Sequence, residues 1–253
     1  MKLKHRIKGE GEPVILLHGL FGSLDNLGSL ARALAENYKV ISVDMRNHGR
    51  SPHADNMNYE LMAADVIELM DDLAIDGTYL FGHSMGGKTA MQVALNHPER
   101  IKKLCIADIA PVAYSHHHEV LLKGMCHVAD ISPDSRRDAI ELLRPYEAED
   151  AVLSFIATNW RKDESGHWGW RLNLEAIIND HTSIMSAVSG RPYTGPVMFV
   201  RGGESNYLLS QYRDEILGLF PNAKVRTIEG AGHWLHAEKP EMFARIVTRF
   251  LAD

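Results

Sequence analysis

A serine between glycines is the feature of this sequence that most clearly indicates chemistry. Residues 79–91 read YLFGHSMGGKTAM, so that Ser84 stands between Gly82 and Gly86 in the spacing G-x-S-x-G. An apolar run precedes Ser84 and helix-forming residues follow it. This pattern is typical of a nucleophile elbow, in which the serine lies on a sharp turn from a strand to a helix and small residues relieve the crowding.

A histidine late in the chain is the expected partner of this serine, because a hydroxyl is a weak nucleophile until a base removes its proton. The segment GAGHW places His233 in a glycine-rich turn between a strand-like run and the last helical pattern. Of the 14 histidines, His233 occupies the expected place in the chain order serine, acid, histidine. We therefore predict that His233 is the general base for Ser84.

The carboxylate that would orient His233 has two candidates. Asp108, in CIADIAP, interrupts an apolar strand, where burying a carboxylate is unfavourable unless it has a partner. Glu204, in FVRGGESNY, follows the next strand, the more usual source of the acid in such a fold, but it stands among polar loop residues. The unusual environment of Asp108 favours it. Ser205 then lies where the usual acid is missing, and we expect it to hydrogen-bond His233 or the carboxylate.

Acyl transfer also needs N–H donors for the developing oxyanion, and backbone amides serve best. The N–H of Met85, directly after the predicted nucleophile, is the first expected donor. The loop HGLFG at 18–22 is expected to supply the second, from Leu20 or, as the alternative, from Phe21. Phe21 and Trp234 flank these loops and are candidates for an acyl pocket, although core packing explains either aromatic equally well.

Other polar residues near these loops are interpreted as structural. His83, beside Ser84, is expected to point to the other side of the turn, without a chemical role. The run at 116–118 consists of three histidines, but adjacent side chains on a helix point in different directions, so no metal site is expected. Buried or loop-bracing roles are expected for four further residues: His18, Asp44, Arg46 and His48.

These residues require a sheet whose strand ends lie close together. Between the strand-like runs lie helical patterns, for instance at 27–38 and 59–75, in which apolar residues recur every three or four positions. The alternation indicates an α/β fold, with a mostly parallel central sheet and helices on both faces. Continuous apolar runs predict its buried strands at residues 14–19, 39–45, 78–84, 103–111 and 197–203.

The alternation breaks between Pro111 and about Pro192, where the pattern reads as helices rather than strands. We therefore predict two parts in the chain. Residues 1–111 and 191–253 form the core, and residues 112–190 are inserted in it as a helical cap.

Composition narrows the classes of function. A chain of 253 residues fits one larger α/β domain, and a net charge of −6 gives no basic stripe for nucleic acid. No apolar run is long enough for a signal peptide or a membrane span. Two cysteines do not form a disulfide framework. We expect a cytoplasmic protein whose partner is a small molecule.

Five segments together resemble the α/β-hydrolases of the bacterial YbfF-type esterase family: HGLFGS, DMRNHGRS, GHSMGGK, DIAP and GAGHWLHAEKP. They span nearly the whole core, whereas the cap matches more loosely, apart from WGWRLNLEAI at 168–177. The resemblance implies an α/β-hydrolase fold with a helical cap, no cofactor, and hydrolysis of short to medium acyl esters, with acyl-CoA thioesters as a further class. It also implies that the aspartate of the D-I-x-P segment, Asp108, is the acid.

The predicted reaction is ester hydrolysis through an acyl-enzyme. Ser84 attacks the acyl carbonyl, His233 acts as the base, first for Ser84 and then for water, and Asp108 orients His233. Two alternatives remain open. One is other serine chemistry on the same frame: carbon–carbon bond hydrolysis, peptidase or perhydrolase activity. The other is a ligand-binding module without catalysis.

Overall fold

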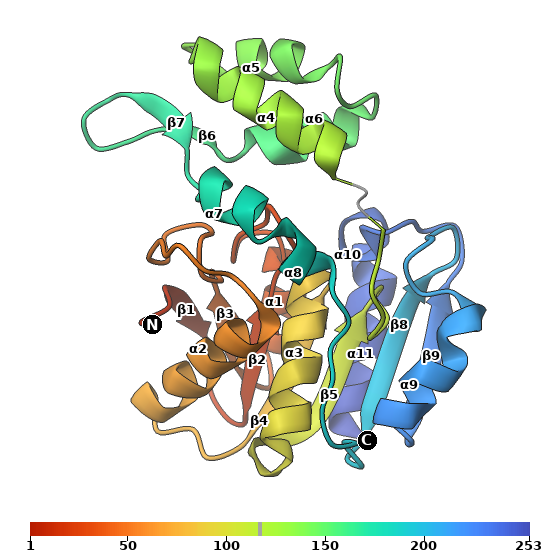
Figure 1. The fold of residues 1–253 in the computed structure, drawn as a ribbon. Helices are drawn as coiled ribbons and strands as arrows, with labels where there is room; N and C mark the ends of the chain where they lie inside the picture. The colour runs from red at the N-terminus through yellow and green to blue at the C-terminus, as the bar shows by residue number, and fades with distance from the viewer. Residues whose placement is uncertain (116–117) are drawn as a thin grey trace.

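The apolar runs form the buried centre of a seven-stranded sheet in the computed structural model, which describes residues 1–115 and 118–253 (Figure 1). Its strand order is β1-β3-β2-β4-β5-β8-β9, with every neighbouring pair parallel except β1 and β3. The predicted α/β fold with a mostly parallel sheet is confirmed. The strands are β1 (His5–Lys8), β2 (Pro13–Leu17), β3 (Lys39–Val43), β4 (Thr78–His83), β5 (Ile101–Ala107), β8 (Val197–Gly202) and β9 (Ala223–Ile228).

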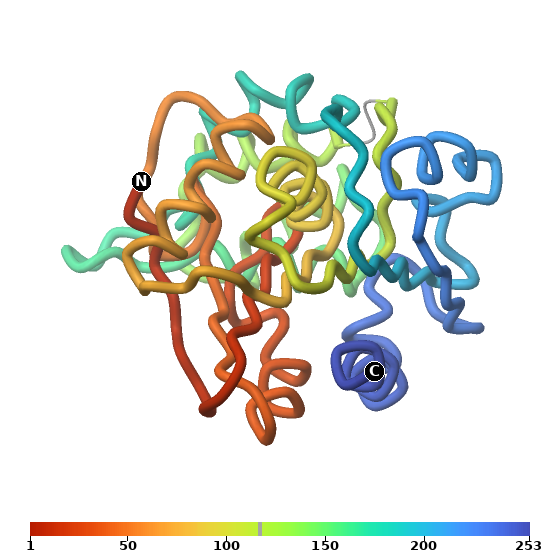
Figure 2. Tube along the Cα trace, turned by 90° about the horizontal axis from the view of Figure 1, so that it is seen from below, coloured from red at the N-terminus to blue at the C-terminus, as the bar shows by residue number. Residues whose placement is uncertain are grey.

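Helices cover both faces of the sheet, because alternate strand residues point to opposite sides. In β2, Ile15 and Leu17 pack in the core on the side of α2 (Tyr59–Asp72) and α3 (Met85–Asn96). Val14 and Leu16 pack in a second core on the side of α1 (Gly28–Leu34) and α11 (Pro240–Ala252). Figure 2 shows the two helix pairs on either side of the strands. The remaining core helices are η1 (Pro98–Arg100), η2 (Ser210–Tyr212), α9 (Arg213–Leu219) and α10 (Leu235–Glu238).

The segment from 112 to 190, here called the inserted segment, lies between β5 and β8, and its helices sit over one end of the sheet (Figure 1). Its elements are α4 (Glu119–Ile131), α5 (Arg136–Leu143), α6 (Asp150–Ala157), β6 (Trp160–Lys162), β7 (Trp168–Trp170), α7 (Leu174–Asn179) and α8 (His181–Met185). His116 and His117 of the histidine run lie outside the described residues. The hairpin β6–β7 differs from the predicted all-helical reading, because strands of three residues are too short to show a period of two.

Two further differences from the predicted strands have physical causes. The first strand, β1, has the charged sequence HRIK and is largely exposed at the sheet edge, so it lacks the apolar signal of a buried strand. The strand predicted at 103–111 ends at Ala107 instead, because Asp108 has a φ of 51° and leaves the extended conformation.

Candidate active site

Ser84 occupies the turn between β4 and α3 in a conformation that few residues adopt. Its φ of 52° and ψ of −119° lie outside the regions favoured by side chains with a Cβ, and such strain is typical of functional turns. The two neighbouring glycines are required by close contacts. A Cβ at Gly82 would collide with the carbonyl of Gly86, and a Cβ at Gly86 would collide with the carbonyl of Leu17. The turn therefore has the backbone geometry of a nucleophile elbow.

Asp108 is fully buried, and three donors satisfy its carboxylate. The Nδ1 of His233 lies 2.8 Å from Oδ2, the backbone N–H of Gly202 donates to Oδ1 at 2.9 Å, and the hydroxyl of Ser205 donates to Oδ2. A carboxylate at this position requires Nδ1 to carry the proton, which leaves Nε2 of His233 as the basic nitrogen.

Glu204, the other candidate for the acid, lies near the site without contacting His233. It lines the same pocket, but its side chain is exposed and makes no hydrogen bond to His233 among the described residues. Its backbone N–H donates to the carbonyl of Ala231. The structure thus brings Asp108, not Glu204, to His233.

Ser84 and His233 line one pocket with a volume of about 850 Å³, within the range usual for small-molecule sites. In the described part of the chain, no hydrogen bond joins their two side chains. Such a bond is often long before substrate binds. The pocket also contains both predicted acyl-pocket residues, Phe21 and Trp234, and the Trp234 ring packs on Phe155 at 5.3 Å between centroids.

The inserted segment supplies one wall of this pocket. Leu121 comes from α4, and Val152, Phe155 and Ile156 come from α6, so these two helices give the wall an apolar part. Glu147 and Glu149, just before α6, also line the pocket. Asn159 of the inserted segment also bonds directly to the core. It is buried, and its side-chain amide donates to the carbonyl of Phe21 at 2.8 Å. The inserted segment is therefore held against the loop that carries Leu20 and Phe21.

The loop at 18–22 packs directly on the serine turn. A Cβ added at Gly19 would lie 3.3 Å from the Cβ of Ser84. The N–H of Phe21, at a φ of 61°, donates to Nε2 of His48 at 3.1 Å and is thereby occupied. Among the described residues, the N–H groups of Leu20 and Met85 donate to no other group. Leu20 is therefore the better of the two predicted alternatives for an oxyanion donor.

Two buried imidazoles hold this loop. Nε2 of His18 accepts from the N–H of Met45 at 3.0 Å, and its Nδ1 donates to the carbonyl of Gly19 at 2.8 Å. His48 is fixed in the same tautomer, because its Nδ1 donates to the carbonyl of Arg46 at 2.9 Å while Nε2 accepts from Phe21. Burial lowers the pKa of His18 to about 4 and that of His48 to about 3, so both rings are neutral near pH 7.

The expected bracing contacts of Asp44 and Arg46 are also present. Asp44 accepts from the backbone N–H of Leu24 at 2.7 Å and from that of Arg50 at 2.9 Å. The guanidinium of Arg46 forms a two-point ion pair with the buried Asp65 at 2.6 and 2.8 Å. These contacts hold the loop after β3 against Leu24 and against α2.

His83 does not point away from the site as expected. Its Nε2 donates to the carbonyl of His233 at 2.9 Å, and the two rings lie 4.8 Å apart. Its ring is also 4.5 Å from that of His236. Burial, aided by His236 and His233, holds the pKa of His83 well below its ordinary value. A neutral His83 therefore fixes the backbone that carries His233.

Tyr207 was not expected at the site from sequence. Its ring stacks on the imidazole of His233, with centroids 3.9 Å apart and an angle of 24° between the planes. No motif marks this tyrosine, and its place two residues after Ser205 is its only signal.

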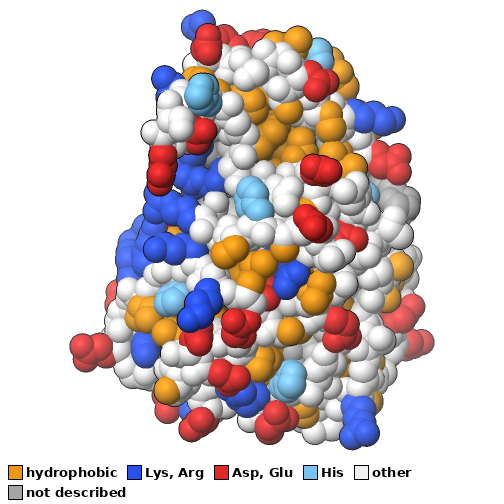
Figure 3. Space-filling model, turned by 60° about the vertical axis from the view of Figure 1, so that its left-hand side comes forward, with side chains coloured by type: hydrophobic (Ala, Val, Ile, Leu, Met, Phe, Trp, Pro, Cys, Tyr) orange, Lys and Arg blue, Asp and Glu red, His pale blue; other side chains and the backbone are white. Residues whose placement is uncertain are grey.

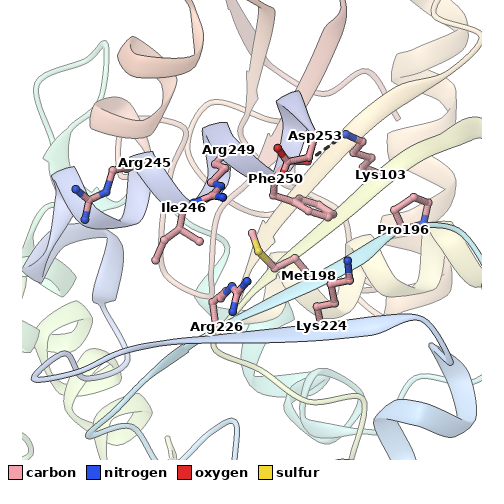
Figure 4. A pocket seen from close by; sticks show the side chains of 10 residues that line it. All are labelled: Lys103, Pro196, Met198, Lys224, Arg226, Arg245, Ile246, Arg249, Phe250 and Asp253. Atoms are coloured by element: carbon pink, nitrogen blue, oxygen red, sulfur yellow. Dashed lines mark hydrogen bonds between the residues drawn. The ribbon is translucent and has the colours of Figure 1, made fainter.

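A second cleft lies far from these residues, near the beginnings of β5, β8 and β9. It has a volume of about 750 Å³ and is bounded by α11, as Figure 4 shows. None of the predicted site residues lines it. Its lining includes five basic side chains, Lys103, Lys224, Arg226, Arg245 and Arg249.

The described residues contain neither a metal-binding cluster nor a membrane-spanning helix. Within residues 1–115 and 118–253, no group of three histidine, cysteine or acidic side chains could hold a metal ion. In the same residues every helix is too short or too polar to cross a membrane.

Comparison with known proteins places this arrangement among enzymes. A family model described as alpha/beta hydrolase fold matches residues 12–125. The chain is 40% identical over 242 residues to Esterase YbfF of Escherichia coli, covering 95% of this chain and 93% of that protein. It is 39% identical over 248 residues to the sn-1-specific diacylglycerol lipase ABHD11 of Mus musculus, covering 94% and 80%. The solved structure of a marine microorganism esterase matches with a TM-score of 0.95 and 38% identity, covering 98% and 99%.

Proposed function

This chain belongs to the α/β-hydrolase family, and from that membership we propose that it is a serine carboxylesterase acting on short to medium acyl esters. The observation that carries the proposal is the 2.8 Å hydrogen bond from His233 to Asp108, made beside the pocket that contains Ser84. Relatives named as esterases and lipases, at about 40% identity over most of the chain, support the same class of reaction.

In the first half of the proposed reaction, Oγ of Ser84 attacks the acyl carbonyl carbon while Nε2 of His233 takes the hydroxyl proton. Asp108 stabilises the resulting imidazolium through Nδ1. The N–H groups of Leu20 and Met85 stabilise the negative oxygen of the tetrahedral intermediate, aided by the positive end of α3. His233 then protonates the leaving alcohol, and an acyl-enzyme remains on Ser84.

In the second half, Nε2 of His233 takes a proton from water, whose oxygen attacks the acyl carbon. The second tetrahedral intermediate collapses, His233 returns the proton to Oγ of Ser84, and the carboxylic acid leaves. No cofactor enters either half. Ser205 is proposed to act as a positioning residue, because its hydroxyl binds the carboxylate of Asp108 rather than any reacting atom.

The pocket supports esters with an uncharged leaving group as the preferred substrates. The inserted segment is proposed to act as a cap, whose apolar wall receives the acyl chain. Four of the residues that line the pocket are glutamates: Glu147, Glu149, Glu204 and Glu238. Because the described lining residues include no lysine or arginine to offset these charges, the pocket repels anions.

A second candidate is hydrolysis of thioesters whose thiol carries phosphate groups. Figure 3 shows Lys and Arg side chains gathered along one side of the molecule. Arg161 and Arg171 do not line the pocket, and both lie within electrostatic reach of Arg50 and Arg136. Burial lowers the pKa of both guanidinium groups, and repulsion from Arg171 and Arg136 adds to the effect on Arg161. For Arg171 the added repulsion comes from Arg50 and Arg136. Such a cluster favours phosphate ligands, since arginine binds phosphate in a bidentate geometry.

The proposed function is tested by labelling the protein with a fluorophosphonate probe and locating the modified residue by peptide mass. We expect labelling at Ser84, lost in Asp108→Asn and retained in Glu204→Gln. Failure of the native protein to label would refute the serine mechanism and favour the ligand-binding module. Loss only in Glu204→Gln would assign the acid to the other carboxylate.

The substrate class is tested on a matched pair, p-nitrophenyl butyrate and butyryl-CoA. We expect a higher kcat/KM for the uncharged ester. A preference for butyryl-CoA that Arg161→Ala or Arg171→Ala reduces would favour the second candidate. The other serine chemistries would be favoured if the protein turned over neither substrate. It would then hydrolyse a carbon–carbon bond or a peptide bond, or form a peracid.

A further inference from the structure

Lys88 is a buried lysine that the proposed mechanism does not use. It lies in α3, where its backbone N–H donates to the carbonyl of Ser84, and its side chain is 1% exposed. Its ammonium donates to the carbonyls of Val112 at 2.7 Å and Ser186 at 2.6 Å, and lies 3.5 Å from that of Met185. Among the described residues it has no carboxylate partner. A buried lysine held only by carbonyl oxygens is unusual and asks for a function.

The three carbonyls belong to the two places where the chain passes between the core and the inserted segment. These two crossings also bind each other, since the N–H of Tyr114 donates to the carbonyl of Met185 at 2.9 Å and that of Val188 donates to Pro111 at 3.2 Å. The ammonium group of Lys88 therefore joins both crossings to α3, the helix that begins directly after Ser84.

A chain of contacts then runs from Lys88 to His233. The ammonium lies 4.7 Å from the centroid of the Tyr114 ring, within the range of cation–π attraction. The hydroxyl of Tyr114 donates to the carbonyl of Tyr207 at 2.5 Å and accepts from the N–H of Ala110 at 2.8 Å. The ring of Tyr207 is the one that stacks on His233 at 3.9 Å.

We propose that Lys88 is a positioning residue for the proposed esterase reaction, which sets the orientation of His233 through Tyr114 and Tyr207. The inference rests on the proposed function, because it concerns the same base. Its physical basis is that the stacking partner of His233 has a backbone held by Tyr114, and the ring of Tyr114 is held in turn by a buried charge.

The energetics of the ammonium are consistent with this role. Burial lowers the pKa of Lys88 to about 7. The carbonyl oxygens and the faces of Tyr114 and Tyr59, the latter 5.5 Å away, are the groups that favour the charged form. Removing the ammonium would leave the carbonyls of Val112 and Ser186 without their donor and free the two crossings to shift.

The chain offers a matched control in Lys103. Its ammonium also donates to two backbone carbonyls, of Phe250 at 3.1 Å and Leu251 at 2.8 Å, and lies 5.7 and 5.8 Å from two aromatic rings, those of Tyr79 and Phe250. Figure 4 shows it in the distant cleft. Lys103→Met therefore removes similar contacts without touching the site.

The experiment compares Lys88→Met with Lys103→Met in the full chain. We expect both variants to melt at a lower temperature. Only Lys88→Met should lose kcat on p-nitrophenyl butyrate and rate of fluorophosphonate labelling, by about 10-fold to 100-fold, with KM within about threefold. A displacement of ~1 Å in a catalytic group has an effect of that size. The downfield NMR signal of the His233 Nδ1 proton should broaden or shift only in Lys88→Met.

Tyr114→Phe provides a second variant that does not disturb the buried charge. It keeps the ring beneath the ammonium and removes only the hydroxyl, which binds both the carbonyl of Tyr207 and the N–H of Ala110, so we expect the same loss of kcat. This variant decides the question if Lys88→Met does not fold.

Three results would overturn the proposal: equal kcat losses in the two lysine variants, a change confined to KM, or an unchanged kcat in Tyr114→Phe. Each of these is distinguishable from failure of the esterase proposal, in which the native protein itself neither labels nor hydrolyses the ester.

Discussion

The hydroxyl of Ser205 donates to Oδ2 of Asp108, the same oxygen that accepts from Nδ1 of His233. The carboxylate comes from the end of β5, and the loop after β8 contributes a hydroxyl to it instead of an acid of its own. One oxygen that accepts from two side chains is held in place more firmly than one that accepts from the imidazole alone. The proposed acid and the hydroxyl proposed to position it therefore come from the ends of two different strands.

The first prediction concerns that hydroxyl. Ser205→Ala should lower kcat on p-nitrophenyl butyrate by about 10-fold, with little change in KM, because a hydrogen bond to a charged group contributes about 1.5–3 kcal/mol and 1.36 kcal/mol corresponds to a tenfold change in rate. Ser210→Ala, at an exposed serine at the start of η2, is the control. A change in kcat of twofold or less would show that Ser205 has no positioning role.

The second prediction separates the two carboxylates by kinetics. Asp108→Asn should lower kcat by about 10³-fold or more, because an amide favours the wrong tautomer of His233 and cannot stabilise its positive charge. Glu204→Gln, an equally conservative change at an exposed side chain, should leave kcat within about twofold. Steady-state kinetics on the same ester make the comparison, and a reversed order of effects would contradict it.

The third prediction is a loss of stability in acid. Burial lowers the pKa of four histidines, of which His18, His48 and His83 are buried and His236 is half-buried. The pKa falls to about 4 for His18 and His236 and to about 3 for His48, and lies well below the ordinary value for His83. Their ordinary pKa is about 6.5, so the unfolded chain binds more protons than the folded chain between pH 6.5 and 4. The unfolding free energy should fall across that window, by at most about 1.4 kcal/mol per pH unit for each histidine.

Urea unfolding at pH 7 and pH 5 measures this dependence, and His236 offers a specific variant. Its Nδ1 is buried without a hydrogen-bond partner among the described residues. His236→Phe should therefore fold well at pH 7 and lose less stability on acidification than the native protein. An identical loss in the two proteins would exclude His236 from the effect.

The fourth prediction concerns the wall of the pocket. Phe155→Ala removes an aromatic side chain that packs on Trp234, and should raise KM for the butyrate ester about 10-fold while kcat stays within about threefold. Burial of a large apolar side chain contributes roughly 1.5–3 kcal/mol, most of it equal in the ground and transition states. Phe250→Ala, in the distant cleft, is the control. An equal KM in both variants would exclude Phe155 from the acyl site.

Local signals in the sequence were enough to predict much of this molecule. Buried strands leave apolar runs, the serine turn requires glycines at Gly82 and Gly86, and a carboxylate such as Asp108 in an apolar strand needs a partner. The edge strand β1 left no such signal, because its side chains face water. The contacts of Tyr207 and His83 with His233 join segments far apart in the chain, so no local pattern records them. Lys88 belongs to the segment GHSMGGK, but its burial depends on contacts with Val112 and Ser186, which lie at the two crossings, far from it in the sequence.

The closeness of those crossings has a consequence for how such a protein diversifies. Ser84, Asp108 and His233 all belong to loops of the sheet, whereas the apolar wall of the pocket comes from a segment whose two ends are joined by the bond from Tyr114 to Met185. A foreign segment whose ends are equally close can be grafted at this junction without stretching the sheet. If the inserted segment sets selectivity as proposed, evolution or engineering can exchange it as a module while Ser84, Asp108 and His233 stay unchanged.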